Sequence, residues 1–179
     1  MAIRLSSGSR RHTHGGDLRP TAARTLESVF NMLAGEVADR RVLDLFCGVG
    51  SYGIVALKQG AASAVFVDRS HESEKRTTRA LSQFRLGERA AFCREEVAHF
   101  LHNSARWAEP FELIFADPPY ELVPPGPVIE SILESGLFAR NGVLVFEHSK
   151  RQAPPEFPGL SLRKSRVFGE TTVSIWDRQ

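Results

Sequence analysis

The sequence predicts an α/β fold of the Rossmann-like type, in which a doubly wound, mostly parallel sheet closes with a C-terminal antiparallel hairpin. Apolar runs typical of buried strands alternate with helical patterns between residues 42 and 147. Residues 160–176 then alternate around Gly169-Glu170, which is typical of a β-hairpin. A G-x-G-x-x-G pattern follows the first strand, where α/β folds commonly bind ligands.

The length and composition favour a single domain. The chain has 179 residues, of which 42% are hydrophobic, enough for one sizeable core. We expect a domain over residues 19–179, preceded by a flexible basic arm over residues 1–18. No apolar run approaches the roughly 20 residues that span a membrane, and the N-terminus lacks the apolar core of a signal peptide. We therefore expect a cytoplasmic protein with no membrane partner, and a monomer.

The net charge of +2 is unevenly distributed along the chain. Residues 1–25 contain five Arg and one Asp, for +4, and residues 150–179 contain six basic and three acidic residues, for +3. The middle therefore carries the remaining −5. Basic ends around an acidic middle indicate a polyanion partner held by its phosphates, although short solvated tails can have the same composition.

The cysteines and histidines indicate neither a disulfide nor a metal. Cys47 and Cys93 each follow an apolar run and are interpreted as small buried residues of a reducing compartment. A nucleophilic Cys47 is an alternative, but the sequence places no base beside it. His12 and His14 are spaced like a metal pair, yet no Cys, Asp or Glu cluster completes a site, so we expect no metal.

The first helix is predicted to begin at Leu18-Arg19-Pro20-Thr21, with Thr21 capping its free N–H groups. Gly35 places the end of this helix near Ala34. Five apolar residues then share one helical face: Leu26, Val29, Phe30, Leu33 and Val37.

The first strand leads into the glycine pattern formed by Gly48, Gly50 and Gly53, and a helix over about residues 51–59 follows. The start of such a helix suits the pyrophosphate of a dinucleotide. It also suits the amino-acid part of S-adenosylmethionine (AdoMet), the methyl donor. Asp44 favours AdoMet, because a carboxylate can bind an ammonium group and would repel a pyrophosphate. A tight turn without any ligand is the remaining alternative.

Two acidic positions follow the second and third strands. Asp68 ends the second strand 20 residues after Gly48, where a ribose-binding carboxylate is expected, or else caps the next helix. After the third strand, Glu95 or Glu96 can bond the adenine amine, or both can start a helix. The other expected elements are strands at 64–68, 90–93, 111–116 and 142–147, helices near 72–84, 97–104 and 128–134, and hairpin strands at 160–168 and 171–176.

The fourth strand ends in Asp117-Pro118-Pro119-Tyr120. A purine amine is a poor nucleophile, because its lone pair is delocalised into the ring. The Asp117 carboxylate and the Pro118 carbonyl can accept its two N–H groups and turn the lone pair toward a methyl donor. Tyr120 can stack on a flipped-out base. A capped proline turn is the alternative, but the end of a strand beside the first strand is where such folds bind ligands.

Taken together, these motifs resemble the RsmD-type 16S rRNA (guanine-N2) methyltransferases of bacteria over nearly the whole chain. Further resemblance lies in Arg24, Glu27 and Phe30 after the Arg-Pro-Thr segment, and in the closing Phe168-Gly169-Glu170-Thr171. The chain differs at Ala23-Arg24, where relatives have an Asp-Arg pair. It also differs at residues 6–11, where relatives have a glycine-rich basic segment.

The resemblance implies a class I AdoMet-dependent methyltransferase that methylates the 2-amino group of a guanine in 16S rRNA, within the 30S subunit or a late assembly intermediate. It implies catalytic roles for Asp117, Pro118 and Tyr120. The donor-binding candidates are Asp44, Phe46, Gly48, Gly50, Gly53, Asp68 and Glu96. The RNA-binding candidates are Arg10, Arg11, Arg19, Thr21 and Arg24.

Three other functions compete with this one. An adenine-N6 nucleic-acid methyltransferase shares the motifs, but the chain offers no separate target-recognition domain. An NAD-dependent oxidoreductase explains the glycines and Asp68 but leaves Asp44 and the Asp-Pro-Pro-Tyr segment unexplained. A non-catalytic RNA chaperone explains only the basic ends.

Overall fold

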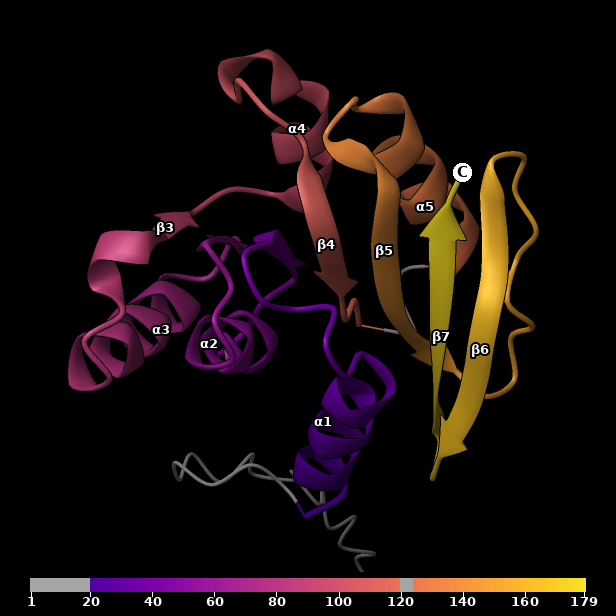
Figure 1. Cartoon of the computed structure of the whole chain (residues 1–179), viewed down its shortest axis with the longest axis horizontal. Helices are drawn as coiled ribbons and strands as arrows, with labels where there is room; N and C mark the ends of the chain where they lie inside the picture. The colour runs from indigo at the N-terminus through magenta and orange to yellow at the C-terminus, as the bar shows by residue number, and fades with distance from the viewer. Residues whose placement is uncertain (1–19, 120–123) are drawn as a thin grey trace, which may run out of the picture.

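The computed structural model describes residues 20–119 and 124–179, and every element below lies within them (Figure 1). The helices are α1 (Pro20–Met32), α2 (Ser51–Lys58), α3 (His71–Gln83), α4 (Val97–His102) and α5 (Pro125–Glu134), with short 3-10 turns η1 (Gly87–Arg89) and η2 (Ser104–Arg106). The strands are β1 (Arg41–Leu45), β2 (Ser63–Val67), β3 (Ala90–Cys93), β4 (Phe111–Ala116), β5 (Phe138–Ser149), β6 (Leu160–Phe168) and β7 (Thr171–Arg178).

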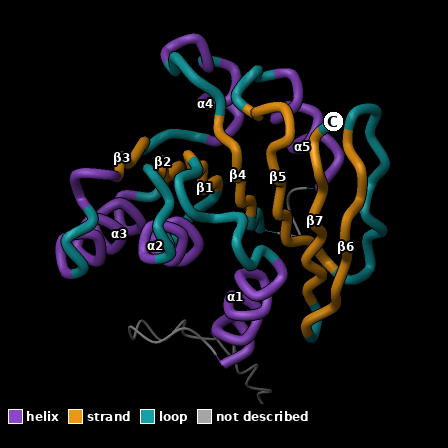
Figure 2. The backbone as a smooth tube through the Cα atoms, in the orientation of Figure 1, coloured by secondary structure: helices purple, strands orange, loops and turns teal. Residues whose placement is uncertain are grey.

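The described strands form one sheet in the order β3-β2-β1-β4-β5-β7-β6. Strands β1 to β5 pair in parallel, whereas β7 is antiparallel to both β5 and β6. This confirms the predicted parallel sheet with a C-terminal hairpin. The chain leaves β1 toward β2 and β3 and then returns to β4, so β1 and β4 flank the topological switch point. Figure 2 shows β3 and β6 at opposite edges of the sheet.

Helices cover both faces of the sheet because successive strand residues point to opposite sides. Val42 of β1 packs with apolar residues of α1, α2 and α3, whereas Leu43 packs with those of α4 and α5. Asp44 lies two residues after Val42 and therefore faces the layer of α1, α2 and α3. The polar residue at the end of β1 is thus directed toward the glycine segment, which starts α2.

The first helix differs from its prediction at both ends. It begins at Pro20, so Thr21 lies within the first turn and the prediction that Thr21 caps the helix is wrong. Proline suits the first helical position, since it lacks an N–H that would need a partner there. The helix ends at Met32, and Val37 is buried beyond it in the following turns.

Other element ends shift for local reasons. β5 begins at Phe138 rather than at Gly142, because Asn141 (φ 59°) and Gly142 are absorbed as an irregularity within the strand. α5 begins at Pro125, three residues before its predicted start. α4 ends at His102 and is followed by η2, so the predicted single helix to residue 104 is wrong. No helix in the described residues is long and apolar enough to cross a membrane.

Candidate active site

A hollow of about 320 Å³ lies at the carboxyl ends of β1, β4 and β5, beside α1. Three of its lining residues are carboxylates, and none of its described lining residues is Lys or Arg, so we call it the acidic hollow. The lining residues are Ala22, Thr25, Leu26, Asp44, Phe46, Cys47, Gly48, Val49, Ser51, Tyr52, Asp117, Glu147, Phe168 and Thr171.

The glycine segment curls because alternate residues have left-handed backbone conformations. Phe46, Gly48 and Gly50 have φ values of 56°, 54° and 75°. The Cys47 N–H donates to Val67 O, and the Gly50 N–H donates to Cys47 O at 2.7 Å. These bonds hold the segment against the end of β2 and place Phe46 and Gly48 on the wall of the acidic hollow. A left-handed non-glycine residue such as Phe46 is costly and is commonly found at functional sites.

Gly53 has a packing role rather than a conformational one. A Cβ atom there would lie 2.3 Å from Cε1 of the buried Phe66 ring and 3.2 Å from Asp44 Oδ2. The Gly53 N–H donates to Asp44 Oδ2 at 2.9 Å. The third glycine therefore lets the first turn of α2 approach the carboxylate of β1.

Asp44 is buried, with 2% of its surface exposed, yet it lines the acidic hollow. Burial raises its pKa well above the usual aspartate value, and the nearby Asp117 and Asp68 carboxylates raise it further. The hydrogen bond from Gly53 opposes this shift. A cation in the hollow would favour the ionised form of Asp44.

Asp68 and Glu96 lie outside the lining of the acidic hollow. The Asp68 carboxylate accepts from the Gly48 N–H at 3.0 Å and from the Ser70 N–H at 2.8 Å, and it thereby ties the glycine segment to the end of β2. Ser70 is the N-cap of α3, so the alternative that Asp68 caps this helix is wrong. The Glu96 side chain is exposed and pairs with Arg69 at 3.0 Å.

The neighbouring Glu95 is engaged differently from Glu96. Its carboxylate contacts His99 and Arg106, and these partners lower its pKa although partial burial raises it. Glu95 is therefore held against α4 and η2. The Glu96 side chain instead extends to Arg69, which follows the end of β2. Glu96 is also the N-cap residue of α4, so the helix-start alternative applies to it, and neither Glu95 nor Glu96 lines the acidic hollow.

The start of the Asp-Pro-Pro-Tyr segment lies where the sequence predicts. Its Asp117 N–H approaches Leu45 O at 3.4 Å, so the end of β4 is joined to the end of β1. Asp117 is exposed at the acidic hollow, whereas Pro118 is buried and is not among the lining residues. The Asp117 carboxylate is therefore both exposed to solvent and part of the wall of the hollow.

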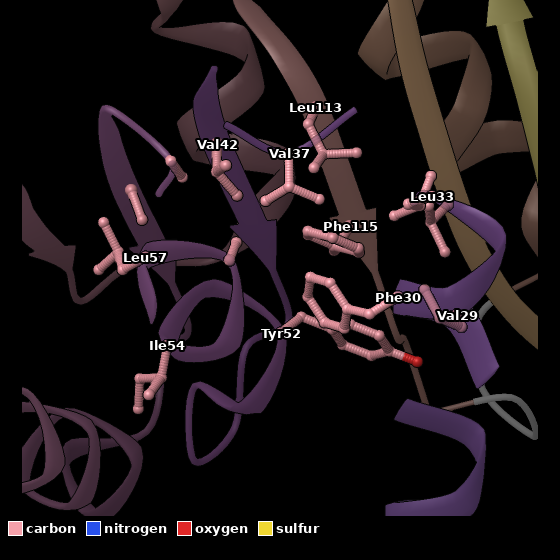
Figure 3. Packing of buried hydrophobic residues seen from close by; sticks show 14 of the residues in the cluster. Val29, Phe30, Leu33, Val37, Val42, Tyr52, Ile54, Leu57, Leu113 and Phe115 are labelled. Atoms are coloured by element: carbon pink, nitrogen blue, oxygen red, sulfur yellow. The ribbon is translucent and has the colours of Figure 1, made fainter. Parts of the chain in front are cut away.

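The acidic hollow also contains a hydrogen-bonded pair of side chains, Tyr52 and Glu147, that the sequence does not predict as site residues. Tyr52, on α2, packs its ring in a cluster with Phe30 and Phe115, with a centroid distance of 6.3 Å to Phe30 and a stacked distance of 4.8 Å to Phe115 (Figure 3). Its hydroxyl donates to the buried Glu147 carboxylate at the end of β5. Glu147 is an acid at the carboxyl end of a predicted strand, the same signal that identified Asp44, Asp68 and Asp117.

The electrostatics of this pair keep the phenol neutral. Burial raises the pKa of Tyr52 well above its usual value, and the Glu147, Asp117 and Asp44 carboxylates add to the shift. Three acidic side chains thus influence one hydroxyl group. Burial and the Asp44 and Asp68 carboxylates likewise raise the pKa of Cys47, so its thiol stays protonated and is a poor nucleophile.

Of the predicted RNA-binding residues, the structure describes the side chain of Arg24 alone. Arg24 is exposed on α1, one residue before the hollow-lining Thr25. The following candidates lie outside the described residues or, for Thr21, have no described side chain: Arg10, Arg11, Arg19, Thr21, Tyr120, His12 and His14. Within residues 20–119 and 124–179, no three His, Cys, Asp or Glu side chains are grouped to hold a metal ion.

The fold is shared with solved structures. The chain aligns with the yhhF protein of Escherichia coli with a TM-score of 0.80 and 25% identity, covering 87% of this chain and 86% of that one. A structure complexed with S-adenosylhomocysteine, SMU.776, aligns with a TM-score of 0.70 at 15% identity, covering 86% and 48% of the two chains. The described fold is the Rossmann-like fold of class I AdoMet-dependent methyltransferases.

Sequence comparisons identify the family within this class. The family described as conserved hypothetical protein 95 matches residues 8–177. The chain is 31% identical to YlbH of Bacillus subtilis over 183 residues, covering 99% of this chain and all of that protein. It is 27% identical to ribosomal RNA small subunit methyltransferase D of Escherichia coli over 163 residues, covering 90% and 80% of the two chains. The chain belongs to this RsmD-type family.

Proposed function

We propose that this chain transfers a methyl group from AdoMet to the exocyclic 2-amino group of a guanine in 16S rRNA. The observation that carries the proposal is the acidic hollow, whose wall includes the buried Asp44 and the accessible Asp117 at the switch point between β1 and β4. The substrate comes from the relatives, one of which is named as a small-subunit rRNA methyltransferase.

The residues of the hollow fit AdoMet. When bound, AdoMet supplies an electrophilic methyl group on a positively charged sulfonium, and it also carries an ammonium group. Burial raises the pKa of Asp44, and repulsion from Asp117 in the hollow and from the nearby Asp68 raises it further. Such a set of carboxylates is stabilised by a cation, and it would repel the pyrophosphate of a dinucleotide. The NAD-dependent oxidoreductase is therefore the weaker explanation of the glycine segment.

Each part of the site has a role in this proposal. Asp44 and the glycine segment hold the amino-acid end of the donor, and Asp68 and Glu96 contact its ribose and adenine. Asp117 and the Pro118 carbonyl accept the two N–H groups of the target amine, so that its lone pair faces the methyl carbon. Tyr120 stacks on the base. The nitrogen–carbon bond forms as the sulfur–carbon bond breaks, and the amine then releases a proton to Asp117 or water.

The wider setting is part of the same proposal. We infer a cytoplasmic monomer whose residues 19–179 form one methyltransferase domain and whose basic residues 1–18 reach the RNA. The substrate is the 30S subunit or a late assembly intermediate. Arg10, Arg11, Arg19, Thr21 and Arg24 are the proposed RNA contacts of the N-terminal segment.

Substitution of Asp117 tests the proposed chemistry. Asp117→Ala removes the acceptor of the amine, so kcat for methyl transfer should fall on the order of 10² to 10⁴-fold. Binding of AdoMet, measured by calorimetry, should weaken far less than kcat falls, because Asp44 and the glycine segment still hold the amino-acid end of the donor.

The matched control is Glu134→Ala, which removes an exposed carboxylate at the end of α5, away from the acidic hollow. It should leave both transfer and donor binding unchanged. Near-normal transfer by the Asp117 variant would contradict the role assigned to this carboxylate.

A further inference from the structure

A second hollow, of about 330 Å³, lies between α1 and β6, and we call it the basic groove. Its lining contains three cations and one carboxylate, together with an amide and a hydroxyl group. The lining residues are Arg24, Glu27, Ser28, Asn31, Met32, Lys164 and Arg166. We propose that the basic groove holds the backbone phosphates beside the target nucleotide, an inference that rests on the proposed function.

Strand pairing places the two β6 cations on the face that α1 covers. Lys164 pairs with Ile175 of β7, and Arg166 pairs with Val173. Ile175 and Val173 are fully buried in the same apolar cluster as residues of α1. Residues opposite one another in a ladder share a face of the sheet. On the face of the sheet beside α1, the apolar side chains of β7 are therefore followed on β6 by two cations, Lys164 and Arg166.

The cations of the basic groove are not neutralised within the described part of the chain. No carboxylate there forms an ion pair with Arg24, Lys164 or Arg166, and Arg166 contacts the Ser28 hydroxyl at 3.5 Å. Arg163, also on β6, differs because it pairs with both Glu36 and Asp177. The groove thus keeps a local positive charge that suits phosphate oxygens.

The basic groove and the acidic hollow adjoin at Phe168. Its ring lines the acidic hollow at the end of β6, and the Arg166 guanidinium lies 5.5 Å from the centre of that ring. Helix α1 also serves both surfaces, with Thr25 in the hollow and Arg24 and Ser28 in the groove. A base inserted into the hollow would therefore leave its own backbone next to the cations.

The acidic hollow and the basic groove give the positively charged donor and the negatively charged RNA separate binding surfaces. The cationic donor belongs in the acidic hollow, whereas the polyanionic substrate would be repelled by the same carboxylates. Cations placed immediately beside the hollow, and not within it, attract the RNA without weakening the donor site. RNA is favoured over an acidic protein as occupant because the pocket chemistry already requires a nucleotide to reach Asp117.

The test neutralises the two β6 cations together, in Lys164→Gln with Arg166→Gln. The matched control is Lys75→Gln with Arg79→Gln, which removes the same charge from exposed positions on α3, near the opposite edge of the sheet. RNA binding is measured as a function of salt, AdoMet binding by calorimetry, and methyl transfer over a range of RNA concentrations. Sedimentation reports self-association.

We expect the β6 variant to raise the KM for RNA while kcat at saturating RNA and the affinity for AdoMet stay near normal. The slope of log K against log salt should fall by about 1.4 to 2, which corresponds to two lost phosphate contacts. The α3 control should keep the original slope.

An unchanged salt slope and KM in the β6 variant would overturn the inference. Increased self-association with unchanged RNA binding would overturn it too, since the cations would then only protect the exposed edge strand from pairing. Absence of methyl transfer to RNA by the unmodified protein would contradict the proposed function itself. That result is distinguishable from one in which the unmodified protein is active and the β6 variant binds RNA normally, which contradicts only the role of the basic groove.

Discussion

Asp44 connects protonation to ligand binding at the scale of one residue. The carboxylate is buried, bonded to the start of α2 and surrounded by other acids, so its pKa is raised. In the ligand-free native state it retains a proton that the unfolded chain loses near the ordinary aspartate pKa. The free energy of unfolding contributed by Asp44 therefore falls as pH rises from that ordinary value through the raised native value.

A bound cation should reverse this shift, which predicts a pH dependence of donor binding. Ionised Asp44 attracts the AdoMet ammonium, so affinity should rise with pH across the raised pKa, with release of a proton on binding. Calorimetry between about pH 5 and about pH 8, in buffers of different ionisation enthalpy, measures both quantities.

Asp44→Asn supplies the matched variant for this prediction. It should bind AdoMet more weakly at neutral pH, and its affinity should be nearly independent of pH over the same range. An affinity that falls with rising pH in the unmodified protein, or an equal pH dependence in both proteins, would show that Asp44 does not face the cation.

At the scale of elements, the junction of β1 and α2 depends on a close approach that only glycine allows. The Phe66 ring is fully buried, so it cannot move aside for a Cβ atom at Gly53 without disturbing the core. Gly53→Ala should reduce the free energy of unfolding by about 1 to 3 kcal/mol. It should also weaken AdoMet binding, because it displaces the first turn of α2 from Asp44.

Gly87→Ala is the matched control for this substitution. Gly87 is exposed in η1, its φ is not left-handed, and a Cβ atom there would meet no atom beyond its chain neighbours within 4 Å, so alanine should leave stability unchanged or raise it by up to about 1 kcal/mol. Chemical denaturation of the two variants, together with donor titration, measures the difference. Equal stabilities would contradict the packing role given to Gly53.

The elements were predictable where the pattern of the sequence is local. Buried strands such as β4 carry continuous apolar runs, and the acids at their ends mark the carboxyl edge of the sheet. β5 was predicted too short because Asn141-Gly142 is typical of a turn, whereas pairing with β4 retains it within the strand. The Thr21 cap failed because two good starting residues, Pro20 and Thr21, compete for adjacent positions.

The site was predictable only in part, since contacts between distant segments leave no local pattern. Tyr52 and Glu147 lie 95 residues apart in sequence and are joined by a hydrogen bond. Lys164 and Arg166 also gain their significance only when β6 is seen beside α1. Asp117, in contrast, was identified because its motif follows directly on a strand whose neighbour could be inferred.

At the scale of the whole molecule, charge is sorted by position. Asp44, Asp117 and Glu147 gather at the switch point of the sheet, and Arg24, Lys164 and Arg166 gather beside it. The overall charge of +2 conceals this separation. We infer that the two surfaces together deliver a guanine of 16S rRNA to a cationic methyl donor.

The most direct test is transfer of labelled methyl from AdoMet to three substrates in parallel, followed by identification of the modified nucleoside. The substrates are 30S subunits that lack the modification, naked 16S rRNA, and duplex DNA. We predict N2-methylguanosine in the RNA of the 30S subunit and no label in DNA. Methyladenine in DNA, or no transfer to either RNA substrate, would contradict the claim.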